Sequence, residues 1–331
     1  PGAADGHALR LQAREMRSAG QPGYGERFRL AAATLSRTGQ PEQAVEALEE
    51  LLVQPGSDFD HFDGLRMKGQ YLLAAGHQAE AWAVVLETLA LADAQPDLKR
   101  FNAGYLTAIY TGSHCRMLAG DIAGELALIE RIAVTDRSRF DEDVVACAMV
   151  EKSSLLDRAG DAAAARQTIQ SLLDTYPTWG VQDGRRMDVE LNHLKRRYPD
   201  ARAPELAAGL AALWNTPANR ARESVLYVGH ELRRALASAG NTASAVAVAR
   251  EMLDLIDARK AEWIAASDNA GGTESSLRQF ESEELEYLAW SAPEGLRTHT
   301  PWALGRLIER ATNPGRRQSL FIRLLRVTGT P

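Results

Sequence analysis

The stretch "LLAAGHQAEAWAVVLETLALA", residues 72–92, decides the fold. Nearly all of its residues are apolar or favour helices, yet the step Gly76-His77 interrupts it. Glycine readily adopts the left-handed conformation that ends many helices, and the polar residue after it can begin the next one. The stretch therefore predicts two helices joined by a tight turn at Gly76.

The same pattern of helix, glycine, polar residue and helix recurs four more times. It is found in "LSRTGQPEQAVEALEELL", "RMLAGDIAGELALIERI", "LDRAGDAAAARQTIQSLL" and "LASAGNTASAVAVAREML". The five turn glycines are spaced by 37, 44, 40 and 80 residues, and the last interval holds one degenerate unit; they are Gly39, Gly76, Gly120, Gly160 and Gly240. A period near 40 residues predicts a repeat architecture built from helical hairpins.

The residue after each glycine should begin the second helix of its hairpin. Asp121, Asp161 and Asn241 are of the types that cap helix N-termini, and Gln40 precedes Pro41, which suits a first helical turn. His77 occupies the same position. We therefore interpret His77 as a residue of the turn and not as a ligand.

Small residues occupy two further positions of the pattern. Seven residues before the glycine stand Ala32, Gly69, Ser113 and Ser153, with Arg233 as the exception. Five residues after it stand Ala44, Ala81, Ala165 and Ala245, with Glu125 as the exception. The chain thereby resembles the tetratricopeptide repeat (TPR) family, although its units run near 40 residues instead of about 34 and lack most of the family's aromatics.

The resemblance implies an all-α fold, a right-handed α-α superhelix of about six helical hairpins with capping helices at its ends. We expect the repeat array, with a leading helix, to span residues 1–263. Its fifth unit is the degenerate one, "DVELNHLKRRYPDARAPELAAGLAALW". Residues 264–331 should form a linker, "ASDNAGGTESS", and a cap of three helices.

Composition and charge exclude several classes of protein. A net charge of −6 disfavours nucleic-acid binding, and two cysteines are too few for a disulfide-dense framework. No apolar run approaches the ~18 residues of a membrane span. The compartment stays open, with the cytoplasm slightly favoured; because the initiator Met is missing, export after removal of an upstream segment is the alternative.

No motif predicts catalysis, a cofactor or a metal site. "GHELRR", residues 229–234, begins like a zinc-protease helix, but Arg234 stands where the second histidine is required. The acidic run "DFDHFD", residues 58–63, suits the start of a helix. Phosphate-binding glycine loops, nucleophile elbows and dinucleotide fingerprints are absent from the sequence.

The resemblance implies a partner-binding site. In the TPR family the first helices line a concave groove that holds a peptide or partner helix, with groove-facing positions ten and six residues before the turn glycine. These positions carry Arg29 and Ala33, Arg66 and Gln70, Tyr110 and His114, Val150 and Ser154, then His230 and Arg234, and the stripe extends to Asp157 and Tyr227. Most are polar, which indicates an open surface. On neighbouring helices, Arg29 and Arg66 would hold a partner's carboxylate between their guanidinium groups.

The sequence therefore predicts a non-catalytic scaffold or adaptor that binds a peptide or helix of another protein in its groove. One alternative is an α/α-toroid carbohydrate-active enzyme using Asp60, Asp63, Glu283 or Glu284, although the scarcity of aromatic residues argues against it. A second alternative is a regulatory or sensor domain of a longer protein, with a small ligand or a peptide gating the groove.

Overall fold

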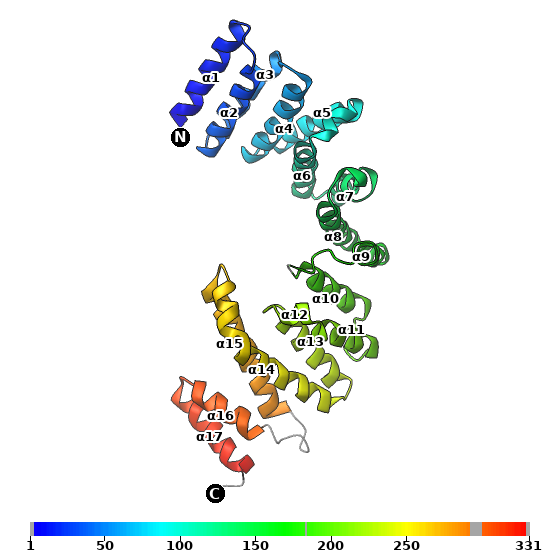
Figure 1. Ribbon diagram of the computed structural model, residues 1–331, viewed down its shortest axis with the longest axis vertical. Coiled ribbons are helices and arrows are strands. Elements are labelled where there is room, and N and C mark those ends of the chain that lie inside the picture. Colours follow the sequence, from blue (N-terminus) through cyan, green and yellow to red (C-terminus); the bar gives the residue numbers. More distant parts are fainter. Residues whose placement is uncertain (1–2, 183, 292–299, 329–331) are drawn as a thin grey trace. The chain divides into compact units, whose positions relative to one another are not determined.

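The computed structural model describes residues 3–182, 184–291 and 300–328, and these residues form helices and connecting turns with no strand (Figure 1). The chain divides into two compact units, Pro1–Tyr176 and Pro177–Pro331, each of which is described by itself. The all-α class predicted from the sequence is thus confirmed. The boundary expected between residues 263 and 264 stays a prediction; α14 (Thr242–Ala266) runs through it.

The N-terminal unit consists of a leading helix and four hairpins. Helix α1 (Ala3–Ser18) packs on α2, and each later helix contacts its successor, directly or through the short turns η1 and η2. The hairpins are α2 (Tyr24–Arg37) with α3 (Pro41–Val53), α4 (Asp58–Ala74) with α5 (Gln78–Ala94), α6 (Asn102–Leu118) with α7 (Ile122–Glu130), and α8 (Glu142–Arg158) with α9 (Ala162–Thr175). Short turns η1 (Pro96–Arg100), η2 (Arg131–Thr135) and η3 (Arg137–Arg139) join successive pairs.

The C-terminal unit contains two hairpins and further helices. The degenerate repeat forms α10 (Arg185–Arg197) and α11 (Pro204–Asn215), and the short α12 (Pro217–Arg220) leads into α13 (Val225–Ser238) and α14. The remaining described elements are α15 (Ala270–Glu286), η4 (Tyr287–Ser291), α16 (Thr300–Arg310) and α17 (Pro314–Thr328). The three expected cap helices are α15, α16 and α17.

The connection between α14 and α15 is shorter than the expected linker. Most of residues 266–276 lie in the first turns of α15, which begins at Ala270. The side chain of Asn269 caps this helix by accepting a hydrogen bond from the Gly272 amide at 3.1 Å. A good cap offsets the poor helix propensity of the two glycines in the first turn.

The turns have the predicted geometry. All five turn glycines have positive φ, and at Gly76 (φ 85°) the His77 amide donates to the Leu72 carbonyl at 2.8 Å. This six-to-one hydrogen bond is the Schellman arrangement that closes a helix. Asp121, Asp161 and Asn241 then accept hydrogen bonds from backbone amides of the next helix, whereas His77 begins α5 without such a bond.

The small residues of the pattern meet inside the hairpins. Ser153 is buried and its hydroxyl donates to the Ala165 carbonyl at 3.0 Å, which joins the two positions across α8 and α9. In the second hairpin, a Cβ on Gly69 would lie 3.7 Å from the Ala81 carbonyl oxygen. The prediction of TPR-like helical hairpins is therefore confirmed by the packing of the chain itself.

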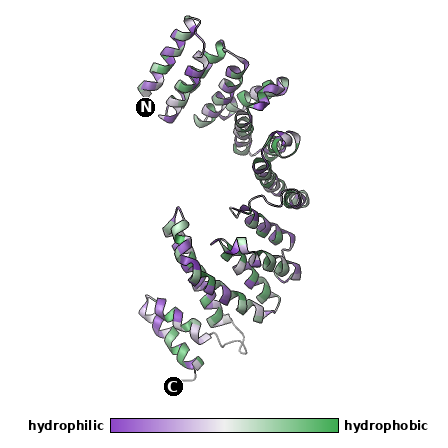
Figure 2. Cartoon of the chain, viewed as in Figure 1, coloured by the Kyte–Doolittle hydropathy of each residue, from purple (hydrophilic) through white to green (hydrophobic). Residues whose placement is uncertain are grey.

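Apolar stripes on the helices form the cores (Figure 2). In the N-terminal unit, Phe28 of α2 packs with Leu48 and Leu51 of α3, and all three side chains are fully buried. In the C-terminal unit, Trp214 of α11 packs with Met252 of α14. No helix within the described residues has both the length and the apolar character needed to cross a membrane.

Candidate functional site

The predicted groove positions of the N-terminal unit lie on α2, α4, α6 and α8, the first helices of their hairpins. Helix α4 contacts both α2 and α6 directly. Helix α4 thus adjoins the first helices of the hairpins before and after it. We call the surface that carries these positions the first-helix face; it is defined by Arg29, Ala33, Arg66, Gln70, Tyr110, His114, Val150, Ser154 and Asp157.

Three of the predicted residues meet in one cavity between α4 and α6. Its volume is about 500 Å³, and Gln70, Tyr110 and His114 line it. His114 is exposed, while Gln70 and Tyr110 are half-buried. The rest of the wall is mostly apolar or hydroxylated, with Leu73, Ala74, Leu106, Thr107 and Thr111. The volume is in the range of small-ligand or side-chain pockets.

The predicted arginine pair is already occupied by carboxylates of the chain. Asp63 lies between the two guanidinium groups, 3.2 Å from Arg29 Nε and 2.7 Å from Arg66 Nε. Arg29 also pairs with Asp60. The expected carboxylate thus comes from α4 itself, and the pair carries no spare charge for a partner's acid.

Arg66 connects this ionic network to the cavity. Its Nη1 donates to Gln70 Oε1 at 2.7 Å, which holds the Gln70 amide at the wall. Sequence reasoning placed Asp60 and Asp63 at the start of a helix and named them for the enzyme alternative, but it did not pair them with the two arginines. The helix start is as expected, since Ser57 caps α4 by accepting a hydrogen bond from the Asp60 amide at 3.1 Å. The signal for the Asp63–Arg66 ion pair was their spacing of three residues on one helix.

Helix α8 continues the first-helix face beside Tyr110. The pKa of Tyr110 is raised to about 12, first by burial and then by the nearby Glu151 and Cys147 of α8. The pKa of Glu151 is itself raised, first by burial and then by the charge of Glu125. On the same helix, Ser154 is exposed and Asp157 is half-buried. Sequence reasoning missed Glu151, which lies between the two register positions of α8.

In the C-terminal unit, side chains of α15 contact the corresponding positions of α13. The Tyr227 ring meets Phe280 edge to face, with centroids 4.8 Å apart, and remains 52% exposed. His230 Nδ1 lies 3.0 Å from Glu284 Oε1, and Arg233 Nε lies 2.6 Å from Glu284 Oε2. Among the predicted residues of this helix, Arg234 is exposed.

The carboxylates named for the enzyme alternative lie in ion pairs. Asp60 and Asp63 pair with Arg29, and Glu284 pairs with Arg233. Glu283 lies 3.5 Å from His230. Across the part of the chain that the structure describes, no group of three or more His, Cys, Asp or Glu side chains is placed to hold a metal ion.

Comparisons with known proteins return structural matches only. No protein-family model and no curated protein matches the sequence. One matching structure is described as a putative kinesin light chain of Podosopora anserina with nearly identical TPR-like repeats; it has 14% identity and a TM-score of 0.38, and the match covers 76% of this chain and 97% of that one. A point variant of the same protein has 13% identity and a TM-score of 0.39, with the same coverage.

Proposed function

We propose that the chain is a non-catalytic protein-interaction scaffold whose N-terminal unit holds an extended peptide, or a helix of a partner, on the first-helix face. The observation that carries this proposal is the cavity of about 500 Å³ between α4 and α6, in which Gln70, Tyr110 and His114 converge. Arrays of helical hairpins present extended surfaces of this kind to their partners.

The cavity indicates the chemistry of the segment it would hold. Gln70 and His114 both donate and accept hydrogen bonds, as does the phenol of Tyr110, which burial keeps protonated. Leu73 and Leu106 supply apolar surface. Because Asp60 and Asp63 already neutralise Arg29 and Arg66, an acidic side chain gains little there. Peptide amides and a medium-sized apolar side chain match this lining best.

Site-specific photo-crosslinking tests where a partner binds. A benzophenone amino acid replaces His114 in one variant and Leu86 in another, which is 48% exposed on the second helix α5. In an extract of the native source, we expect the label at position 114 to capture a defined partner band that the label at 86 does not. Equal capture at both positions would place binding elsewhere.

A quantitative test uses the captured partner segment as a synthetic peptide. The double variant Gln70→Ala with His114→Ala should weaken its binding by roughly tenfold or more, since two hydrogen-bonding contacts are removed. Leu86→Ala serves as the matched control, and both proteins should unfold at similar urea concentrations. Unchanged affinity in the double variant contradicts the proposal.

A further inference from the structure

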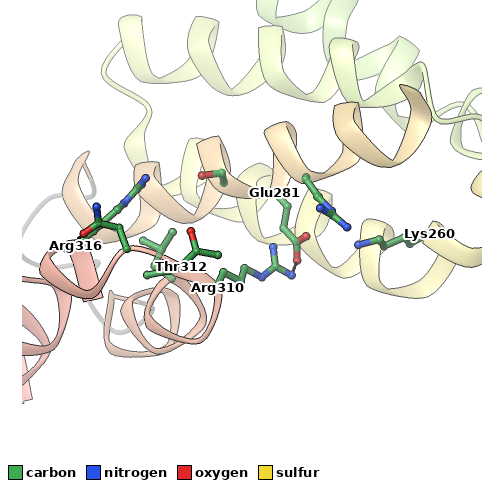
Figure 3. A pocket seen from close by; sticks show the side chains of 10 residues that line it. Lys260, Glu281, Arg310, Thr312 and Arg316 are labelled. Atoms are coloured by element: carbon green, nitrogen blue, oxygen red, sulfur yellow. Dashed lines mark hydrogen bonds and ion pairs between the residues drawn. The ribbon is translucent and has the colours of Figure 1, made fainter. Parts of the chain in front are cut away.

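A second cavity lies in the C-terminal unit, far in sequence from the first-helix face. Its volume is about 510 Å³, and α14, α15, α16 and α17 all contribute to its wall. Figure 3 shows its lining: Lys260 and Arg316 lie at opposite ends, with Glu281, Arg310 and Thr312 between them. Nothing in the sequence pattern or in the proposed scaffold role accounts for this cavity.

Positive charge dominates the lining. Four cationic side chains, Lys260, Arg278, Arg310 and Arg316, face a single carboxylate, Glu281. Two of the cations have partners at the rim: Arg278 donates to Glu274 at 2.5 Å, and Arg316 pairs with Glu286. These are exposed pairs, which water screens and a ligand can compete with.

The remaining two cations differ, and it is Lys260 that leaves the lining with excess positive charge. Among the described residues, no carboxylate lies within ion-pair distance of Lys260. Arg310 pairs with Glu281; Arg306 also donates to Glu281 Oε1 at 2.9 Å but is neutralised by two hydrogen bonds to Asp257. The pKa of Arg310 is lowered, first by burial and also by the nearby charge of Arg278, although Asp257 opposes this. The cavity therefore has a surplus of positive charge.

Glu281 lies in the wall of the cavity and is itself buried. Its side chain is 1% exposed, and its other oxygen, Oε2, accepts no hydrogen bond from the described residues. A buried carboxylate oxygen without a donor is costly to leave unsatisfied. Because that atom has almost no accessible surface, a molecule in the cavity does not reach it, and Glu281 serves as the counterion of Arg310.

We propose that this cavity binds a small soluble phosphate ester. The phosphate dianion matches Lys260 and Arg278, while Arg316 and the Thr312 hydroxyl, away from Lys260, offer donors to the body of the ester. The lining thus offers more donors than the two oxygens of a carboxylate accept. A volume of about 510 Å³ exceeds that of phosphate alone and leaves room for a polar body.

Calorimetry on the full chain tests the proposal. The probes are glucose 6-phosphate, glucose, inorganic phosphate, succinate and vesicles that contain phosphatidic acid. We expect glucose 6-phosphate to bind, inorganic phosphate to bind more weakly, and glucose and succinate to bind at least about tenfold more weakly than glucose 6-phosphate. Binding to the vesicles alone, stronger binding of succinate, or no binding of glucose 6-phosphate would overturn it.

A pair of charge reversals locates the binding. Lys260→Glu changes a cavity residue that has no ion-pair partner in the described part of the chain, and Arg326→Glu makes the same charge change on exposed surface of α17 outside the lining. We expect Lys260→Glu to weaken glucose 6-phosphate at least about tenfold and Arg326→Glu to leave it within about twofold. Similar affinities in both variants would overturn the assignment. Since the first-helix face is untouched, failure here leaves the scaffold proposal standing.

Discussion

One position of the repeat is used differently in the two units. Seven residues before Gly160, in α8, Ser153 is buried and bonds within its own hairpin to the Ala165 carbonyl. Seven residues before Gly240, in α13, Arg233 is also buried but reaches outside its hairpin to Glu284 of α15. The repeat pattern gives both hairpins the same backbone. The side chain at this one position, Ser153 or Arg233, determines whether the first helix also contacts a helix outside its hairpin.

A related contrast is visible ten residues before Gly120, which follows α6, and ten residues before Gly240, which follows α13. In α6 that position is Tyr110, which lines an open cavity; in α13 it is His230, which lies against Glu284. An equivalent register position therefore lines a cavity in the N-terminal unit and takes part in internal packing in the C-terminal unit. Polar character alone does not distinguish these two uses.

The strongest test of this comparison removes the buried carboxylate. Glu284→Ala leaves Arg233 buried without its partner, and we expect a loss of about 3–5 kcal/mol of unfolding free energy in urea denaturation. The neighbouring Glu283→Ala is the control, because its contact with His230 is long and its side chain is 40% exposed; it should cost less than about 0.5 kcal/mol. Equal losses would show that α15 is not held to α13 by this pair.

A smaller effect should be the same in both units. Gly160 and Gly240 have φ of 86° and 79°, and a Cβ on either would meet no atom within 4 Å. Replacement by alanine should thus cost about 1–2 kcal/mol at each position, solely from the left-handed backbone. Gly271→Ala, in a helical turn with equally open space, should be neutral or stabilising by up to about 1 kcal/mol. Unequal costs at Gly160 and Gly240 would show that the two units differ in the turns themselves.

What the sequence predicts well is local. The turn glycines, the caps at Asp121, Asp161 and Asn241, and the small residues depend on neighbours within one hairpin, so a repeated pattern reveals them. The register likewise identifies the helical surface that contains Gln70, Tyr110 and His114.

What the sequence does not predict depends on contacts between hairpins. Arg29 and Arg66 are at the expected positions, but Asp63 occupies the place of a partner's carboxylate. Arg233 breaks the small-residue pattern visibly, yet its partner Glu284 lies beyond the repeats, where no periodicity relates the two. The basic cavity needs residues from four helices, and no single segment carries a recognisable motif for it.

The smallest effect concerns the charge that the open face retains. Burial, assisted by the charge of Glu125, raises the pKa of Glu151 above its ordinary value of 4.5, so the folded chain binds a proton more tightly than the unfolded chain. The contribution of this group to stability is therefore complete below pH 4.5 and is lost as pH rises through the folded-state pKa.

Glu151→Gln should stabilise the protein at pH 7 by less than about 1 kcal/mol, since the group is only half-buried, and should have no effect at about pH 3.5. Urea denaturation at both pH values measures this difference, with Glu142→Gln at the start of the same helix as the control. A stabilisation that persists at about pH 3.5 would arise from packing and not from the charge of Glu151 beside Tyr110. The open face of the N-terminal unit and the neutralised face of α13 would then not differ through this charge.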